Sequence, residues 1–190
     1  PDGRIVYGLG AIKGLGEGPI EAIVEARDAG GPFSNLFDFC ERVDPKRMNK
    51  RALESLIGSG ALDKLTPPSD LEGHDLLNHA RSLLFGNAAA AMKAADQKAQ
   101  NEDSGHLDLF GDESFSMGET SDQPYMLSGF AELDFKARLD KEKDSLGLYL
   151  TGHPIEIYGE EVRRLAKTRI VDLLASKEPQ AVAGPVVGMR

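Results

Sequence analysis

Residues 12–20 read Ile-Lys-Gly-Leu-Gly-Glu-Gly-Pro-Ile, and this stretch decides how the first part of the chain folds. Gly14 and Gly16 flank one leucine, as in a tight turn between two helices, where a residue with a positive φ angle is needed. A short helical turn is predicted before it, around residues 9–12. A helix is predicted after it, because Pro19 suits the first helical position and the apolar residues that follow recur at helical spacing. The stretch therefore predicts a helix-hairpin-helix unit.

A turn of this kind can bind phosphate through its main chain. Where β-carbons are missing, backbone N–H groups can approach a phosphate oxygen closely. The N-terminus of the following helix adds a partial positive charge, worth about 0.3–1 kcal/mol at an exposed site. Such contacts do not read bases, so binding would not depend on DNA sequence. The candidate residues for this contact are Lys13, Gly14, Leu15, Gly16 and Gly18.

The same turn could also join two helices and bind nothing. Glu17 and Glu21 flank it and would repel phosphate, whereas Lys13 alone would attract it. The spacing of the glycines leaves both interpretations open.

The densest basic stretch of the chain lies between residues 42 and 51. Its cations could lie along the same phosphate backbone as the glycine turn, and Arg47, Lys50 and Arg51 are the candidates for DNA contact. The alternative is a solvated helix face, which is the commoner role of such a charge run.

Capping residues and periodicity predict the remaining elements. Asn49 is a predicted cap for a helix over residues 50–59, and a long helix is predicted over residues 76–98, because alanine is the strongest helix former. Residues 180–189 have the pattern of an opening β-strand. The chain is thus predicted to be mainly α, in five segments: a tandem helix-hairpin-helix DNA-binding unit (1–66), an alanine-rich helical extension (67–100), an acidic flexible linker (101–135), a helical segment (136–178) and the start of a further domain (179–190).

The net charge of −9 comes from one part of the chain. Residues 101–135 hold nine carboxylates and no lysine or arginine, so the net charge does not argue against a nucleic-acid partner for the rest. The composition of this stretch predicts a mobile linker, because it offers too little apolar surface to offset the entropy of ordering. Cys40 is a lone cysteine, which excludes an internal disulfide, and no apolar run is long enough to span a bilayer. No metal site is predicted from the spacing of the histidines.

His106-Leu107-Asp108-Leu109-Phe110 lies within the acidic stretch. Large apolar side chains are unusual in such a composition, and a docking peptide that becomes ordered on a partner explains them. The alternative is that the pentapeptide folds back onto its own domain.

Five blocks of sequence together resemble the alpha subunit of bacterial DNA polymerase III, the replicative polymerase: residues 7–18, 31–33, 36–40, 49–63 and 142–154. In that family, tandem helix-hairpin-helix elements grip duplex DNA behind the active site. The resemblance implies this role for Lys13, Gly14, Leu15, Gly16 and Gly18, and a second, degenerate unit around residues 49–60.

The resemblance also has implications for the rest of the chain. Residues 106–110 occupy the place of the family's internal sliding-clamp motif, with His106 where glutamine is usual. The last residues would open the family's OB domain, which is cut off here. The catalytic aspartates, and the Mg²⁺ that they hold, are expected upstream of Pro1, so no catalytic residue and no cofactor is assigned to this segment.

The leading hypothesis is a fragment of a longer protein that binds duplex DNA and tethers a polymerase to its sliding clamp for processive synthesis. Its expected partners are duplex DNA, the clamp and other replisome subunits, in the cytoplasm and without a membrane. Two alternatives stay open. One is a protein-interaction scaffold whose hairpins touch no DNA, and the other is a repair-type helix-hairpin-helix enzyme with a catalytic lysine or aspartate beside the turn.

Overall fold

The computed structural model describes residues 7–103, 125, 128–184 and 186. The chain divides into two units, Pro1–Leu148 and Tyr149–Arg190, which are described separately below. The described residues are mainly helical, as the sequence predicts, and no strand forms among them. None of the helices in these ranges has both the length and the hydropathy needed to cross a bilayer.

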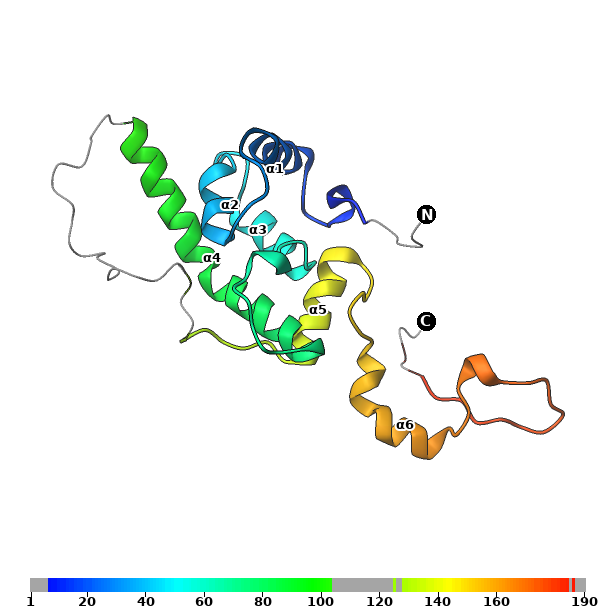
Figure 1. Ribbon diagram of the computed structural model, residues 1–190. Coiled ribbons are helices and arrows are strands. Elements are labelled where there is room, and N and C mark those ends of the chain that lie inside the picture. The colour runs from blue at the N-terminus through cyan, green and yellow to red at the C-terminus, as the bar shows by residue number, and fades with distance from the viewer. Residues whose placement is uncertain (1–6, 104–124, 126–127, 185, 187–190) are drawn as a thin grey trace. The chain divides into compact units, whose positions relative to one another are not determined.

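The first unit consists of short and long helices (Figure 1). In chain order these are η1 (Leu9–Ala11), α1 (Glu17–Gly30), α2 (Leu36–Arg42), α3 (Lys50–Gly58), η2 (Asp63–Leu65), α4 (Gly73–Asp103) and α5 (Phe135–Leu146). The second unit contains η4 (Pro154–Tyr158), α6 (Gly159–Leu165) and η5 (Ile170–Asp172).

The long helix α4 is the element against which the first unit packs. It lies along α2, α3 and α5, and its contact with α2 is the most extensive. Buried apolar side chains recur every three or four residues on one face, and all but one of them are alanines, which lets the neighbouring helices approach closely: Ala80, Leu84, Ala88, Ala91 and Ala95. The helix begins three residues before the predicted range 76–98 and ends five residues after it. Helix α4 forms the core of the hairpin region. The predicted alanine-rich segment is therefore not a separate extension of that region.

Asparagine or aspartate side chains cap the N-termini of three of these helices. Asn49 Oδ1 accepts a hydrogen bond from the N–H of Ala52 at 2.9 Å, which confirms the predicted cap of α3. Asn35 caps α2 and Asp134 caps α5 in the same way. A glycine, Gly16, is the N-cap of α1, and no side chain caps this helix.

The predicted start of α1 is two residues too late. The helix begins at Glu17, so Pro19 is its third residue and not its first. Proline is tolerated there because the amides of the first turn have no acceptor within the helix. The helix stops at Gly30, and Gly31 follows with a φ of 76°.

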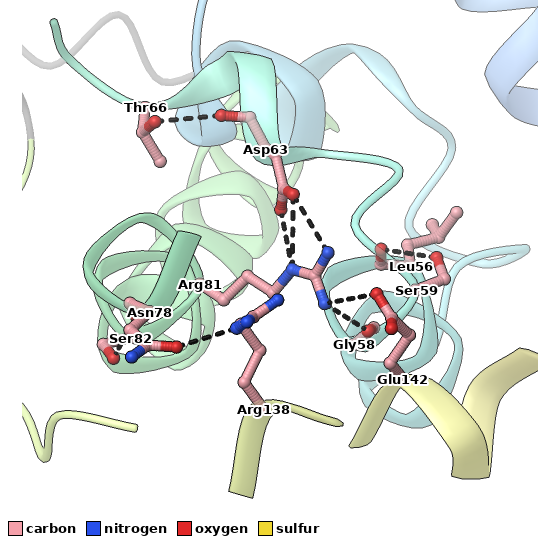
Figure 2. Close-up of polar contacts among 10 residues, drawn as sticks. All are labelled: Leu56, Gly58, Ser59, Asp63, Thr66, Asn78, Arg81, Ser82, Arg138 and Glu142. Carbon is pink, nitrogen blue, oxygen red and sulfur yellow. Dashed lines mark hydrogen bonds and ion pairs between the residues drawn. The ribbon is translucent and has the colours of Figure 1, made fainter. Parts of the chain in front are cut away.

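A buried ionic network joins α4, α5, η2 and the end of α3, as Figure 2 shows. The Arg81 side chain is 2% exposed, and its Nη1 lies 3.2 Å from both Glu142 Oε1 and the carbonyl oxygen of Gly58. Its Nε donates to Asp63 Oδ1 at 3.1 Å. Burial raises the pKa of Asp63, against the opposing effect of Arg81 and with a smaller upward effect of Glu142. Charges this deeply buried require their partners, so the network fixes how these elements meet.

Part of the predicted linker 101–135 belongs to the folded unit. Residues 101–103 end α4, and the buried Tyr125 hydroxyl accepts from the N–H of Leu36 at 2.7 Å and donates to the carbonyl of Leu65. The N–H of Leu133 donates to Ser82 Oγ at 2.7 Å. The linker assignment is therefore wrong for these residues. Residues 104–124 lie outside the described ranges.

In the second unit, the side chain of His153 caps the helical turn η4. Its Nδ1 accepts from the N–H of Ile155 at 3.3 Å, and its own N–H donates to Glu156 Oε1 at 2.6 Å. The described residues of the predicted final segment, 179–184 and 186, form no strand. The assignment of this segment to an OB domain is not confirmed.

Candidate nucleic-acid interface

The glycine turn between η1 and α1 exposes its glycines to solvent and is held to the core by one buried leucine. Gly14 has a φ of 80°, which is the left-handed conformation that a tight turn requires and that only glycine adopts without strain. Leu15, between the two glycines, is 6% exposed and packs in the hydrophobic core with Ile12. Gly14 and Gly16 are exposed. The leucine thus holds the turn against the protein while the glycines face outward.

The backbone amides of this turn divide into two groups. The N–H of Lys13 donates to the carbonyl oxygen of Ser145 at 2.7 Å, and the N–H of Leu15 donates to the carbonyl oxygen of Ile12 at 3.2 Å. The N–H groups of Gly14, Gly16, Glu17 and Gly18 have no acceptor among the described residues. Unpaired amides at a helix N-terminus are donors for an anion, because they carry the positive end of the helix dipole.

Helix α3 places a cation beside the turn. A β-carbon added to Gly14 would lie 3.6 Å from Ser55 Oγ and 3.8 Å from Arg51 Nε. The sequence predicts Arg51 and the glycine turn as separate candidates, and the fold brings them side by side.

The turn, α3 and α5 together line a groove of about 480 Å³. Three cations and two carboxylates border it, and the complete lining is Lys13, Gly14, Arg51, Glu54, Ser55, Phe85, Lys141, Asp144 and Ser145. One of the carboxylates, Glu54, lies 3.7 Å from the ammonium of the exposed Lys50. The groove thus combines the unpaired amide of Gly14 with an excess of positive charge, which suits a phosphate group.

Comparison with known proteins agrees with this geometry. The helix-hairpin-helix motif family matches residues 1–69. The whole chain is 53% identical over 192 residues to the DNA polymerase III subunit alpha of Pseudomonas aeruginosa, and covers 16% of that protein. It is 43% identical over 197 residues to the protein of the same name from Escherichia coli K12, and 41% identical over 191 residues to that from Vibrio cholerae. It covers 15% of each of these two proteins.

The chain belongs to the DNA polymerase III alpha subunit family. It corresponds to one segment, since it spans about a sixth of the length of the curated relatives. The helix-hairpin-helix motif lies within this segment.

The arginines in the basic stretch of this alpha-subunit segment have different partners in the structure. Arg47 does not line the groove. Its guanidinium lies 2.6 Å from Glu21 Oε2 and 2.7 Å from Glu25 Oε2, on the side of α1. It therefore neutralises Glu21, one of the two carboxylates that the sequence analysis expects to repel phosphate. Arg42 points inward and donates to the carbonyl oxygens of Ala26 and Gly31, each at 2.8 Å.

The second, degenerate hairpin is covered by the same chain. Its glycines, Gly58 and Gly60, follow the pattern of the first turn, and Gly60 also has a positive φ of 82°. A β-carbon on Gly58 would lie only 2.7 Å from Ser145 Oγ, and one on Gly60 would collide with the guanidinium of Arg81. In this structure Gly58 is buried against α5, and the N–H of the half-buried Gly60 already donates to the carbonyl oxygen of Ile57 at 3.0 Å. This turn therefore does not present the exposed, unpaired amides that the tandem prediction requires.

The predicted clamp-binding residues His106, Leu107, Asp108, Leu109 and Phe110 lie outside the described residues. Sequence reasoning also misses part of the groove, namely Phe85 of α4 and the α5 residues Lys141, Asp144 and Ser145. No local motif marks them, because only the packing of α5 against α3 and α4 brings them to the turn.

Proposed function

We propose that the first unit of this alpha-subunit segment binds the backbone of duplex DNA through the glycine turn. One observation carries the proposal: the exposed Gly14, whose N–H is unpaired, lies next to the side chain of Arg51, and the unpaired N–H of the exposed Gly16 follows two residues later. A phosphate oxygen would accept from the amides, and the guanidinium of Arg51 and the ammonium of Lys13 would neutralise its charge.

Two properties follow from this chemistry. Main-chain donors contact phosphate and not base edges, so affinity would be independent of DNA sequence. The neutralised phosphates would release counterions, so affinity would fall steeply with salt. Duplexes of two unrelated sequences, titrated with the chain by fluorescence anisotropy at several salt concentrations, test both. We expect equal affinities and a linear fall of log K with log salt. A flat response to salt, or no binding at low salt, would contradict the proposal and favour the scaffold that contacts only protein.

We further propose that His106–Phe110 tethers the polymerase to its sliding clamp, as the family resemblance implies. Two attachment points support this role. Asp103 ends α4, and the hydroxyl of Tyr125 is held by α2 and η2, so the peptide is joined at both ends to the DNA-binding unit. A clamp bound there would keep the DNA site at a high effective concentration near the primer end, which is the physical basis of processivity.

The tether is tested separately from DNA binding. Changing Leu109→Ala together with Phe110→Ala removes two apolar anchors, and we expect it to abolish binding to the purified clamp while duplex affinity stays the same. Equal clamp affinity of the wild-type and double-variant chains would refute this assignment. The family resemblance also leads us to expect that the protein belongs to the replisome and is located in the cytoplasm.

A further inference from the structure

Helix α5 contributes one face to the groove. Lys141, Asp144 and Ser145 line it, and their spacing of three and four residues places them on the same side of the helix. These residues lie far along the chain from the helix-hairpin-helix match, which ends at residue 69. The hairpin motif by itself does not account for this side of the groove.

The packing of α5 fixes this face beside the turn. The carbonyl oxygen of Ser145 accepts the N–H of Lys13, and its hydroxyl lies against the backbone of Gly58 at the end of α3. Glu142, the residue after Lys141, is fully buried and bonded to Arg81. Because Glu142 and Ser145 are both held by their contacts, α5 keeps Lys141 on the groove side.

The ammonium of Lys141 is positioned without being neutralised. Its Nζ lies 4.5 Å from the centroid of the Phe85 ring, an arrangement that attracts a cation to the ring face. Lys141 makes no ion pair with a carboxylate in the part of the chain that the structure describes. The ring orients the ammonium and leaves its full charge and its N–H donors for another acceptor.

We propose that Lys141 contacts a phosphate of the DNA backbone, which makes α5 a part of the interface in addition to the hairpin. This inference rests on the proposed DNA binding of the glycine turn. It assigns to α5 a binding residue, and not only the structural role of closing the hairpin.

The test compares Lys141→Gln with Lys136→Gln in the full 190-residue chain. Lys136 is on the same helix but away from the groove, where its ammonium lies 2.7 Å from Asp140. Both changes remove one positive charge, so they alter the long-range field equally. If Lys141 neutralises one phosphate, Lys141→Gln lowers the slope of log K against log salt by about 0.9, and Lys136→Gln leaves it unchanged. Lys141→Arg keeps the charge and should keep the slope.

The outcomes distinguish failure of the Lys141 inference from failure of the proposed DNA binding at the glycine turn. Equal slopes for Lys141→Gln and wild type, with Arg51→Ala reducing the slope, would overturn the role of Lys141 alone. No effect of Arg51→Ala or of Lys141→Gln would overturn both. A loss of affinity in Lys141→Gln without a change in slope, accompanied by a lower melting temperature, would show a packing role with Phe85 and would also overturn the inference.

Discussion

The backbone N–H of Lys13 donates a hydrogen bond of 2.7 Å to the carbonyl oxygen of Ser145. This bond joins the glycine turn to the last turn of α5, across most of the length of the first unit's sequence. The ammonium of Lys13 also lies near Gly147, where α5 ends, so its charge faces the negative end of that helix dipole. The turn is therefore held in place by a helix that is distant in sequence, and its outward amides remain available.

Replacing Gly14 with alanine should destabilise the turn through its backbone conformation. The added β-carbon would meet Ser55 Oγ at 3.6 Å, which is an ordinary contact, so the cost arises from the φ of 80°. We expect a loss of about 1–2 kcal/mol in the free energy of unfolding, measured by urea denaturation, and weaker duplex binding.

Gly18→Ala is the matched control for this change. Gly18 lies in the first turn of α1, and a β-carbon there would have nothing within 4 Å. Alanine is the better helix former, so this variant should be neutral or more stable by up to about 1 kcal/mol. Equal destabilisation by the two substitutions would contradict the strained-turn explanation.

Arg81→Ala should be among the most destabilising single changes in the first unit. It leaves the buried carboxylate of Glu142 without its Arg81 ion pair and deprives Asp63 of a guanidinium partner. Removing one partner of such a buried ion pair costs about 3–5 kcal/mol. Chemical denaturation measures the loss, with Arg47→Ala as the comparison.

The Arg47 pairs with Glu21 and Glu25 lie at the surface, and such exposed pairs contribute at most about 1 kcal/mol. Arg47→Ala should therefore cost far less than Arg81→Ala. Similar losses for the two variants would mean that the network of Arg81 does not hold the helices together.

The stability of α2 should depend on pH through Asp38. Burial would raise its pKa, but the N–H of Ser34, at 2.8 Å, and the guanidinium of Arg42, at 3.1 Å, outweigh burial and lower the pKa below its ordinary value. A lowered pKa means that the stabilisation is present above the ordinary value of 3.8 and is lost as the pH falls through the folded-state value.

Asp38→Asn tests this dependence. The wild-type chain should be more stable than this variant at pH 7, and the difference should shrink as unfolding is measured at progressively lower pH, below about 4. A difference that stays constant with pH would show that the ionised carboxylate is not the stabilising group.

The local features of the fold are those that the sequence predicts well. The cap at Asn49 and the positive φ of Gly14 depend on residues within one or two turns. Leu15 is predicted as a DNA-contact residue, but its side chain is buried in the core and its N–H donates to the carbonyl oxygen of Ile12. The start of α1 is misplaced by two residues, because a glycine cap has no side chain to mark it. The prediction of a mainly helical chain is confirmed for the same local reason, since helical periodicity is a short-range signal.

The parts that sequence reasoning misses depend on contacts distant along the chain. Arg81 meets Glu142, and Tyr125 meets Leu36, only after α4 has been placed at the centre. Likewise Arg47 belongs to a basic run by sequence, but its position against α1 gives it two carboxylate partners. Lys141 reaches the groove through the packing of α5, and a linear pattern cannot show that.

Duplex affinity of the Arg51→Ala and Arg47→Ala chains, measured across a series of salt concentrations, tests the central claim most directly. The two arginines lie four residues apart, but Arg51 borders the glycine turn and Arg47 is paired with Glu21 and Glu25. We predict that Arg51→Ala weakens binding and lowers the salt slope by about 0.9, while Arg47→Ala leaves the slope unchanged. The reverse order, or equal slopes for both variants and the wild type, would contradict DNA binding at the glycine turn.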